Sequence, residues 1–473
     1  MQKFTKIIAT IGPASCSPEI LRELYEAGMD AARINLSHGD RPSQAAYIKS
    51  IRQLESNFPI LLDTKGPEIR TGGMRCAVQV SSSETRCLVH APDKEDPEVI
   101  PVDYPYLKDI ETGSKILFDD GLVESEVIER RDHELILRML NEGVIGSGKK
   151  VTIQGHRTRL PFLTERDKED VLFAIENHIQ LLAVSFVRSA RDVKSLRAFI
   201  AQHGATMKII SKIEHSDAVA NLNEILEQSD GIMVARGDLG VELPLQEVPG
   251  IQERIIHQCN QAGKPVIVAT QMLESMRACP RPTRAEVTDI VHAIQQGADA
   301  IMLSAETATG SYPVRSVAMM ALIARQYEKG VKGLIKKYRR REERGRVDIA
   351  VYIAKAAYYA SNELDAKAIL TPTETGFTAR NVSRLKPKCP ILASTKDPAV
   401  VQLLHLVWGV FPMLDQKGVL DLNHYDMSHQ LIQHYYEADV LSLEDRIIIT
   451  SGSNLMKKRG TNLLEIYAVE DII

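Results

Sequence analysis

The residues with the most evident chemistry follow two neighbouring apolar runs in the middle of the chain. Residues 207–211 lead into Lys212 and Glu214, and residues 231–234 lead into Asp238. Side chains alternate along a strand, so Lys212 and Glu214 would lie on one face of a strand that reaches them. Asp238 could join them from the neighbouring strand. One ammonium group beside two carboxylates is a combination that binds a divalent metal ion and a phosphate group.

Polar residues also follow earlier apolar runs. Arg33, Asn35 and Ser37 would share one face if their strand continues that far. The segment from Asp63 to Arg70 places polar and backbone-shaping residues behind another run. Loop capping by Asn, Ser and Asp explains a single cluster of this kind. Eight such clusters, each directly after an expected strand, favour a shared functional site over loop capping.

The elements that would position these residues alternate between strand and helix. The expected strands are residues 6–11, 31–34, 60–62, 181–184, 207–211, 231–234, 266–269 and 300–303. Helices are expected at residues 18–27, 190–203, 218–228, 248–262 and 284–296. Eight repeats of strand and helix predict an α/β fold, a closed (β/α)8 barrel. The polar clusters fall at the carboxyl ends of the strands, where such barrels carry their active sites.

Two regions depart from this alternation. From residue 71 to about 155 the pattern has period two, with hairpin signals at 119–121 and 131–133, which predicts a small β-barrel inserted as a lid. After a charged run at 336–346, expected to be a solvated helix and linker, a C-terminal α/β domain follows. Its expected strands are residues 368–370, 391–393, 409–411 and 447–450. The expected domains are the barrel at 1–70 and 158–335, the insert at 71–157 and the C-terminal domain at 346–473.

The composition excludes several classes of protein. A net charge of −4 over 473 residues gives no reason to expect nucleic acid or a membrane as partner. Six cysteines without a CxxC motif argue against a zinc knuckle or a disulfide scaffold and fit a reducing cytoplasm. No signal peptide precedes the first expected strand, and no uncharged apolar stretch is long enough to cross a bilayer.

Eight strings of the barrel resemble the pyruvate kinase family. They are Ala-Thr-Ile-Gly-Pro-Ala (9–14), Arg-Ile-Asn-Leu-Ser-His-Gly (33–39), Leu-Leu-Asp-Thr-Lys-Gly-Pro-Glu-Ile-Arg-Thr-Gly (61–72), Ser-Lys-Ile-Glu (211–214), Met-Val-Ala-Arg-Gly-Asp-Leu-Gly-Val-Glu (233–242), Ala-Thr-Gln-Met-Leu-Glu-Ser-Met (269–276), Pro-Thr-Arg-Ala-Glu (282–286) and Met-Leu-Ser-Ala-Glu-Thr-Ala (302–308). The resemblance implies transfer of the phosphoryl group of phosphoenolpyruvate to ADP, which gives ATP and an enolpyruvate that is then protonated to pyruvate.

The resemblance also implies roles for the residues at the carboxyl ends of the strands. Lys212 would neutralise the phosphoryl group in flight, and Glu214 and Asp238 would hold Mg²⁺ or Mn²⁺. Thr270 resembles the residue linked to protonation of the enolate, through water. The implied catalytic residues are Lys212, Arg33 and Thr270, and the implied substrate-binding residues are Arg33, Lys212, Gly237, Asp238 and Thr270.

The same resemblance implies a monovalent-ion site and a nucleotide site. Asn35, Ser37, Asp63 and Thr64 match the K⁺ site of the family, and Glu68 stands where potassium-dependent members carry glutamate. The residues implied to face the nucleotide are Asn35, His38, Arg70 and Lys149. Ser304 and Glu306 are expected either to support the site or to act in it directly. The family resemblance also implies a homotetramer.

Two segments differ from the family pattern. The return from lid to barrel, residues 148–155, keeps a lysine but lacks the usual Asn and Pro. In the C-terminal domain, residues 371–378 could bind a sugar-phosphate or nucleotide effector, although Glu374 and Phe377 are unfavourable there and helix capping explains the threonines equally well. Two alternatives follow: a Mg²⁺-dependent enolate lyase or aldolase on a related barrel, and a non-catalytic effector-binding paralogue.

Overall fold

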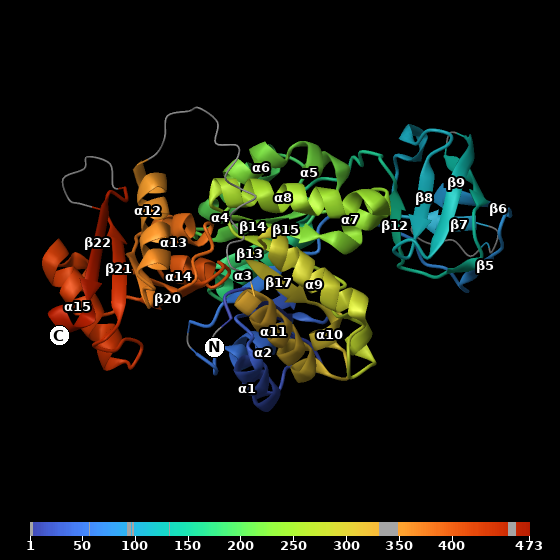
Figure 1. Cartoon of the computed structure of the whole chain (residues 1–473). Coiled ribbons are helices and arrows are strands. Elements are labelled where there is room, and N and C mark those ends of the chain that lie inside the picture. The colour runs from blue at the N-terminus through green and yellow to red at the C-terminus, as the bar shows by residue number, and fades with distance from the viewer. Residues whose placement is uncertain are drawn as a thin grey trace.

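The computed structural model of the chain describes residues 3–55, 57–91, 96, 99–131, 133–330, 349–452 and 460–473. The barrel lies in the middle of the molecule, with the β insert on one side and the C-terminal domain on the other (Figure 1). The charged run at 336–346 lies outside the described residues. None of the described helices is both long enough and apolar enough to cross a membrane.

Eight parallel strands close into the predicted barrel in the order β1-β17-β16-β15-β14-β13-β3-β2. The strands are β1 (Lys6–Thr10), β2 (Ala31–Asn35), β3 (Ile60–Asp63), β13 (Leu181–Val184), β14 (Lys208–Ile213), β15 (Gly231–Ala235), β16 (Val266–Ala269) and β17 (Ala300–Leu303). Their apolar side chains are almost fully buried, inside the barrel and against the surrounding helices. The predicted (β/α)8 fold is therefore confirmed.

The helices around the barrel begin and end at capping residues. They include α1 (Pro18–Ala27), α2 (Arg41–Ile51), α3 (Glu165–Glu176), α4 (Ala190–Gln202), α8 (Val248–Ala262), α9 (Arg284–Gln296) and α11 (Pro313–Gly330). Thr283 and Glu286 form a capping box at the start of α9, and Gly297 ends that helix in the left-handed conformation. These signals explain why α1, α8 and α9 have the bounds that the sequence predicts.

One expectation about the helices was wrong. The helix expected at 218–228 is two helices, α5 (Ser216–Ala220) and α6 (Leu222–Gln228), which meet at Asn221. The Asn221 amide caps α5 by donating to the carbonyl of Asp217, and its side chain donates to the carbonyl of Arg188 at 2.9 Å. The segment after β15, to which the sequence assigned no element, is the short helix α7 (Arg236–Glu242).

The insert is an all-β domain with its own apolar core. Its larger sheet has the order β4-β12-β8-β9-β10-β6-β7, with β4 (Ile69–Arg70), β12 (Lys150–Ile153), β8 (Lys115–Phe118), β9 (Val123–Arg130), β10 (Glu134–Met139), β6 (Thr85–His90) and β7 (Val99–Val102). A second sheet pairs β5 (Val78–Val80) with β11 (Gly143–Ile145). Residues 119–121 all have positive φ and join β8 to β9 as the predicted hairpin.

The C-terminal domain has one five-stranded sheet in the order β20-β19-β18-β21-β22. Its elements are α12 (Ile349–Glu363), β18 (Ala368–Pro372), α13 (Phe377–Ser383), β19 (Ile391–Thr395), α14 (Pro398–Leu404), β20 (Val410–Leu414), α15 (His424–Glu437), β21 (Arg446–Ser451) and the antiparallel β22 (Leu463–Ala468). The sequence predicted the first four strands but not β22.

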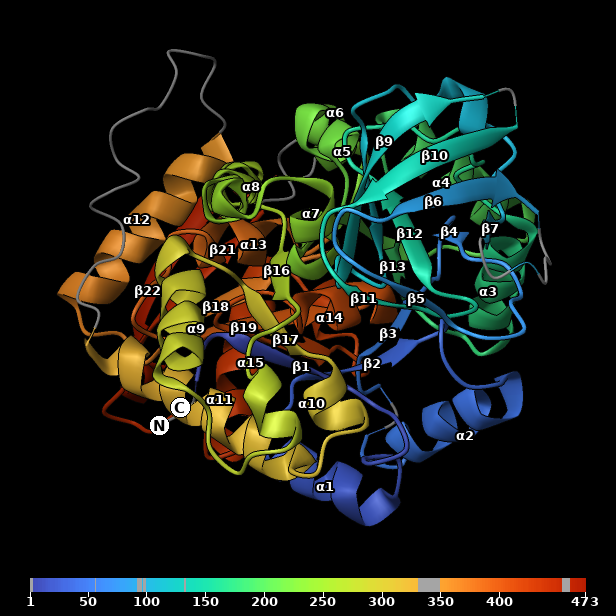
Figure 2. The ribbon, with the colours of Figure 1, turned by 90° about the vertical axis from the view of Figure 1, so that its right-hand side faces the viewer.

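The C-terminal domain covers the amino-terminal end of the barrel. Leu403 and Leu406 join the apolar cluster inside the barrel. Lys6, at the start of β1, donates to the carbonyl of Val410 at 2.7 Å. This packing leaves the carboxyl ends of the barrel strands, here called the rim, for the insert, whose strand β12 contacts α7 at that end (Figures 1 and 2).

Candidate active site

Lys212 lies near the end of β14 with its ammonium group among oxygen atoms. Its Nζ is 2.8 Å from Glu214 Oε1 and 3.1 Å from Asp63 Oδ1, and it donates to Ser185 Oγ at 2.7 Å. Burial alone would lower the pKa of Lys212, but the carboxylates of Asp63 and Glu214 outweigh burial and raise it above its ordinary value. The ammonium group therefore carries a full positive charge at neutral pH.

Asp63 and Arg33 form a buried ion pair beside this ammonium group. Arg33 Nε donates to Asp63 Oδ2 at 2.7 Å, and Arg33 Nη1 donates to Thr10 Oγ1 at 3.0 Å. Burial would raise the pKa of Asp63, yet Lys212 and Arg33 together lower it, so its carboxylate is ionised. Among the described residues Arg33 Nη2 has no hydrogen-bond partner, which leaves one donor of the guanidinium group for a ligand.

Glu214 and Asp238 are the two carboxylates that the sequence placed together. Glu214 Oε2 accepts a hydrogen bond from the amide of Phe186 at 2.7 Å, and burial raises the pKa of Glu214, with Asp238 adding to the effect and Lys212 opposing it. Burial would also raise the pKa of Asp238, but Lys150 and Lys212 lower it. Strands β14 and β15 are neighbours with Ile213 opposite Val234, so Lys212 and Glu214, which are 2.8 Å apart, lie at the strand end next to the one that leads into Asp238.

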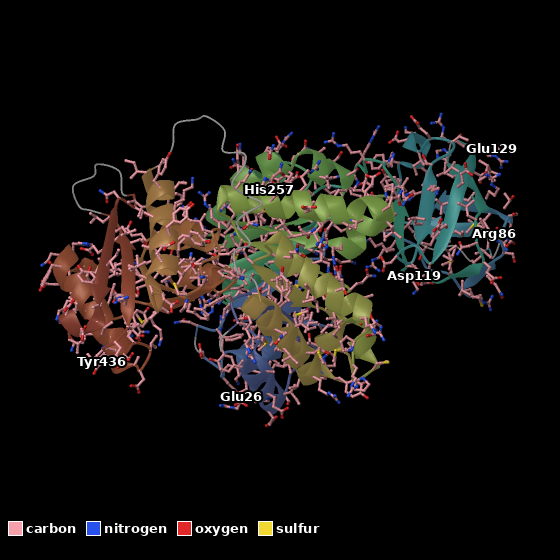
Figure 3. All side chains as sticks on the ribbon, in the orientation of Figure 1. Glu26, Arg86, Asp119, Glu129, His257 and Tyr436 are labelled. Atoms are coloured by element: carbon pink, nitrogen blue, oxygen red, sulfur yellow. The ribbon has the colours of Figure 1, made fainter. Side chains whose placement is uncertain are left out.

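The two neighbouring lysines of the lid return have different partners. Lys149 Nζ is 2.7 Å from Asp119 Oδ2, within the insert, on its side toward the barrel (Figure 3). Lys150 instead forms an ion pair with Asp238 and lies 5.5 Å from the centre of the Phe186 ring. The structure therefore brings Lys150, and not the expected Lys149, to the rim. Successive side chains of an extended segment point to opposite faces, so the two lysines cannot both face the rim. The register of β12 against β4, in which Lys150 lies opposite Arg70, decides which lysine does.

Thr270 follows β16 in a left-handed conformation that a β-branched residue rarely adopts. Its φ is 69°, and that of Gln271 is 54°. The amide of Gly237, in the first turn of α7, donates to Thr270 Oγ1 at 2.8 Å. The hydroxyl has no acceptor for its own proton among the described residues. Thr270 thus contacts the first turn of α7, in which Asp238 follows Gly237.

The four residues matched to a K⁺ site lie at the ends of two adjacent strands. Asn35 pairs in register with Asp63, and Asn35 Oδ1 accepts a hydrogen bond from the Ser37 amide at 3.1 Å. The carbonyl of Thr64 accepts from Ser185 Oγ at 2.7 Å. Ser185, which also contacts Lys212, was not singled out from the sequence, although it directly follows the fourth barrel strand.

The other residues that were predicted to lie at the rim are found at the edge of the rim. His38 is exposed, and its carbonyl accepts a hydrogen bond from Gln44 Nε2 at 2.8 Å. Arg70 Nε donates to Glu68 Oε2 at 2.9 Å, and Arg70 Nη1 donates to the carbonyl of Gly148 at 2.6 Å. These contacts join β4 to the lid return.

Glu306 fastens the loop after β16 to the loop after β17. It is fully buried, and its carboxylate accepts from the amides of Leu273 at 3.1 Å and Ser304 at 2.7 Å. Both carboxylate oxygens of Glu306 therefore already accept hydrogen bonds from backbone amides. The geometry favours the supporting role for Glu306 and Ser304 over a direct one.

A pocket of about 380 Å³ lies beside the lid return, away from the ammonium and carboxylate groups of the rim. It is lined by Arg157, Thr158, Arg159, Leu160, Arg188, Ser189 and Asp192. Each of its arginines already has partners: Arg157 lies 3.5 Å from Asp217, Arg159 lies 3.0 Å from Asp109, and Arg188 donates to backbone carbonyls. These contacts account for the three arginines without a bound ligand.

A further carboxylate, Glu242, lies at the end of α7, and burial raises its pKa to about 8. Lys150 opposes this shift, whereas Asp238 and Asp217 add to it. The native state therefore holds this proton more tightly than the unfolded chain, so Glu242 stabilises the fold at low pH and loses that contribution as the pH rises from about 4.5 through about 8.

We expect Glu242→Gln, which is neutral at every pH, to unfold at a higher temperature than the unmodified protein at pH 8.5 and at a similar temperature near pH 5. The difference in unfolding free energy should grow by up to about 1.4 kcal/mol per pH unit across that interval. Thermal unfolding at several pH values measures it. Glu253→Gln, an exposed control on α8, should show no such trend. Equal stability of both variants at pH 8.5 would contradict a protonated Glu242.

Two family models match the barrel and the C-terminal domain. Residues 2–317 match the model of the pyruvate kinase barrel domain, and residues 352–467 match that of the pyruvate kinase alpha/beta domain. A solved structure described as a pyruvate kinase from Cryptosporidium parvum superposes with a TM-score of 0.91 at 34% identity, covering 99% of this chain and 96% of that one.

Curated relatives are similar over the whole chain. The pyruvate kinase of Sporosarcina psychrophila is 43% identical over 480 residues, which cover 99% of this chain and 81% of the relative. That of Geobacillus stearothermophilus is 42% identical, with 100% and 81% covered, and that of Clostridium acetobutylicum is 39% identical, with 99% and 100% covered. With the barrel, the insert and the rim residues in place, these similarities show that the chain belongs to the pyruvate kinase family.

Proposed function

We propose that Lys212, Glu214 and Asp238 form the centre at which this enzyme carries out the reaction of its family, the transfer of a phosphoryl group from phosphoenolpyruvate to ADP. The observation that carries the proposal is the convergence of one charged ammonium group and two carboxylates at the rim. A lyase or aldolase would not need ADP or the lid, and membership of the pyruvate kinase family argues against that alternative.

The two carboxylates suit a small, hard cation. Mg²⁺ and Mn²⁺ favour carboxylate oxygens, and in phosphoryl transfer they are held by few protein ligands, with substrate oxygens and water completing the shell. The ion pair between Lys150 and Asp238 shows that a positive charge is accommodated there. We propose that Glu214 and Asp238 hold the metal ion, which when bound supplies positive charge to the phosphoryl and enolate oxygens.

The remaining steps fall to residues of the chain. Arg33, with one free donor, would bind the phosphate group of phosphoenolpyruvate. Lys212 would offset the charge that spreads over the phosphoryl oxygens during transfer. The amides at the start of α7 and Thr270 would bind the substrate carboxylate. The Thr270 hydroxyl, which has a proton to give, would relay it through water to the enolate carbon.

We further propose that Asn35, Ser37, Asp63 and Thr64 bind K⁺, since all four present oxygen atoms at the ends of two adjacent strands. Asn35, His38 and Arg70 would face the nucleotide from the edge of the rim. Lys150 is the better candidate for the lid lysine, because Lys149 is held by Asp119.

Lys150 also competes with a metal ion for Asp238. We expect Lys150→Met to raise the affinity of the nucleotide-free enzyme for Mn²⁺ by about tenfold, because the substitution removes a charge-assisted contact worth about 1.5–3 kcal/mol. Electron paramagnetic resonance of free Mn²⁺ measures the affinity. The matched variant Lys149→Met removes the neighbouring ammonium group and should leave Mn²⁺ affinity unchanged. Equal effects of the two substitutions would contradict the contact with Asp238.

We also propose an effector site, an oligomeric state and a cellular environment. A sugar-phosphate or nucleotide effector would bind near residues 371–378, although Thr373 already accepts from the Gly376 amide and Thr378 bonds to Thr461. A homotetramer is consistent with exposed Tyr352 and Tyr359 on α12. The six free cysteines suit a reducing, cytoplasmic environment.

The deciding experiment is ATP formation from phosphoenolpyruvate and ADP, with and without K⁺, at saturating Mg²⁺. We expect turnover that depends on both ions. The same assay with added sugar phosphates or AMP tests the effector proposal. No ATP formation under any of these conditions would favour a non-catalytic paralogue and would overturn the proposed centre.

A further inference from the structure

Arg236, the first residue of α7, is a buried arginine to which the proposed chemistry gives no part. Its side chain is 11% exposed and makes an ion pair with Asp289, with Nη1 2.6 Å from Oδ2. Its other donors point to the last residue of β16 and to the loop that follows it. Nε donates to the carbonyl of Ala269 at 3.3 Å, and Nη2 donates to the carbonyl of Thr270 at 2.6 Å and contacts Met272 Sδ at 2.8 Å.

That loop needs an external support. Among the described residues, consecutive non-glycine residues with positive φ occur at 119–120 and at 270–271. The first pair is a hairpin turn, which requires that conformation. The second follows a buried strand and includes a β-branched residue, so each residue there carries strain of about 1–3 kcal/mol. Such strain persists only where neighbouring contacts outweigh it.

The planar guanidinium group is suited to this task. It directs several N–H donors along fixed directions, so it can hold two successive carbonyls at once. Asp289 fixes the group from the other side. The next residue, Gly237, donates its amide to Thr270 Oγ1 at 2.8 Å. Two successive residues of α7 thus hold the backbone and the hydroxyl of Thr270.

We infer that Arg236 is a positioning residue that holds the strained Thr270 in the conformation from which its hydroxyl proton reaches the substrate. The inference rests on the proposed role of Thr270 in protonating the enolate. It gives the arginine of the Arg236-Gly237-Asp238 string a role at Thr270, where the Gly237 amide also binds, whereas Asp238 is proposed to hold the metal ion.

The exchange of the methyl hydrogens of pyruvate with solvent deuterium separates this role from general support of the fold. That exchange is the reverse of enolate protonation, and NMR can follow it without turnover of phosphoenolpyruvate. We expect Arg236→Met to slow the exchange by about 100-fold, a loss typical of a misplaced proton-transfer group, while Mn²⁺ affinity and unfolding temperature change little. Arg236→Lys, which keeps the charge but loses the fork, should restore little of the rate. Arg254→Met, which removes another carbonyl-binding arginine, on α8, is the matched control.

A double-mutant cycle with Thr270→Ala completes the test. If Arg236 acts through Thr270, the double variant exchanges no more slowly than Thr270→Ala alone. Additive losses, or an unaltered rate in Arg236→Met, would overturn the inference about Arg236. An unaltered rate in Thr270→Ala would instead overturn the proposed role of Thr270. Should Arg236→Met fail to fold, Asp289→Asn loosens the same guanidinium group from a partly exposed position and should slow the exchange to a smaller extent.

Discussion

Lys212→Met should lower the turnover number by about 100- to 1,000-fold while the enzyme still binds phosphoenolpyruvate. Loss of one preorganised charge that acts on the transition state typically has an effect of this size. The Michaelis constant should change much less, because Arg33 and the start of α7 still bind the substrate. Steady-state kinetics at saturating Mg²⁺ and K⁺ gives both quantities.

The structure also indicates how well this variant should fold. Without Lys212, Asp63 keeps its ion pair with Arg33, and Glu214 keeps the hydrogen bond from the Phe186 amide. We therefore expect a loss of stability smaller than the roughly 3–5 kcal/mol seen when removal of one partner leaves a buried charge unpaired. Lys168→Met, which removes a surface lysine paired with Glu165, is the control for loss of a lysine. A Lys212→Met enzyme that keeps more than a tenth of its turnover would rule out the role proposed for the ammonium group.

The barrel could be predicted because local signals repeat along it. The buried runs of the eight strands, and caps such as Ser17 before α1 and Thr283 before α9, lie close in sequence to the elements that they define. Two elements lacked such signals. Strand β22 is a half-exposed edge strand whose pairing with β21 depends on contacts across the domain. The expected helix divides at Asn221, whose side chain bonds to Arg188, a residue distant in the sequence.

The part of the site that depends on a single strand could be predicted from the sequence. Alternation along β14 is enough to place Lys212 and Glu214 together, and the structure sets them 2.8 Å apart. Contacts that depend on register between segments were missed. Ser185 reaches Lys212 from the adjacent strand, and Lys150 reaches Asp238 from the insert, 88 residues away in the chain. A short sequence pattern indicates which side chains share a face of one strand. It does not indicate contacts between segments that are far apart in the chain.

Glu214→Gln should weaken the binding of Mn²⁺ by at least 100-fold, since even residues that only support metal ligands change affinity by about 10- to 100-fold when replaced. Glutamine has nearly the same shape and can still accept the hydrogen bond from the Phe186 amide, so the fold should be retained. Activity should fall in parallel and recover in part at high metal concentration. Isothermal titration with Mn²⁺ in the absence of nucleotide measures the affinity directly.

The matched control for this substitution is Glu242→Gln. Glu242 is also a buried glutamate near Lys150 and Asp238, but its pKa is raised to about 8, so at pH 7 it is already largely protonated and offers a metal ion no charge. The same chemical change should therefore leave Mn²⁺ affinity nearly unaltered at position 242 and greatly weaken it at position 214. If the two variants lose affinity equally, the ion is bound by the acidic surroundings as a whole, and the assignment of Glu214 as a direct ligand fails. A loss confined to Glu214→Gln, which Asp238→Asn should reproduce, would identify these two carboxylates as the protein ligands of the metal.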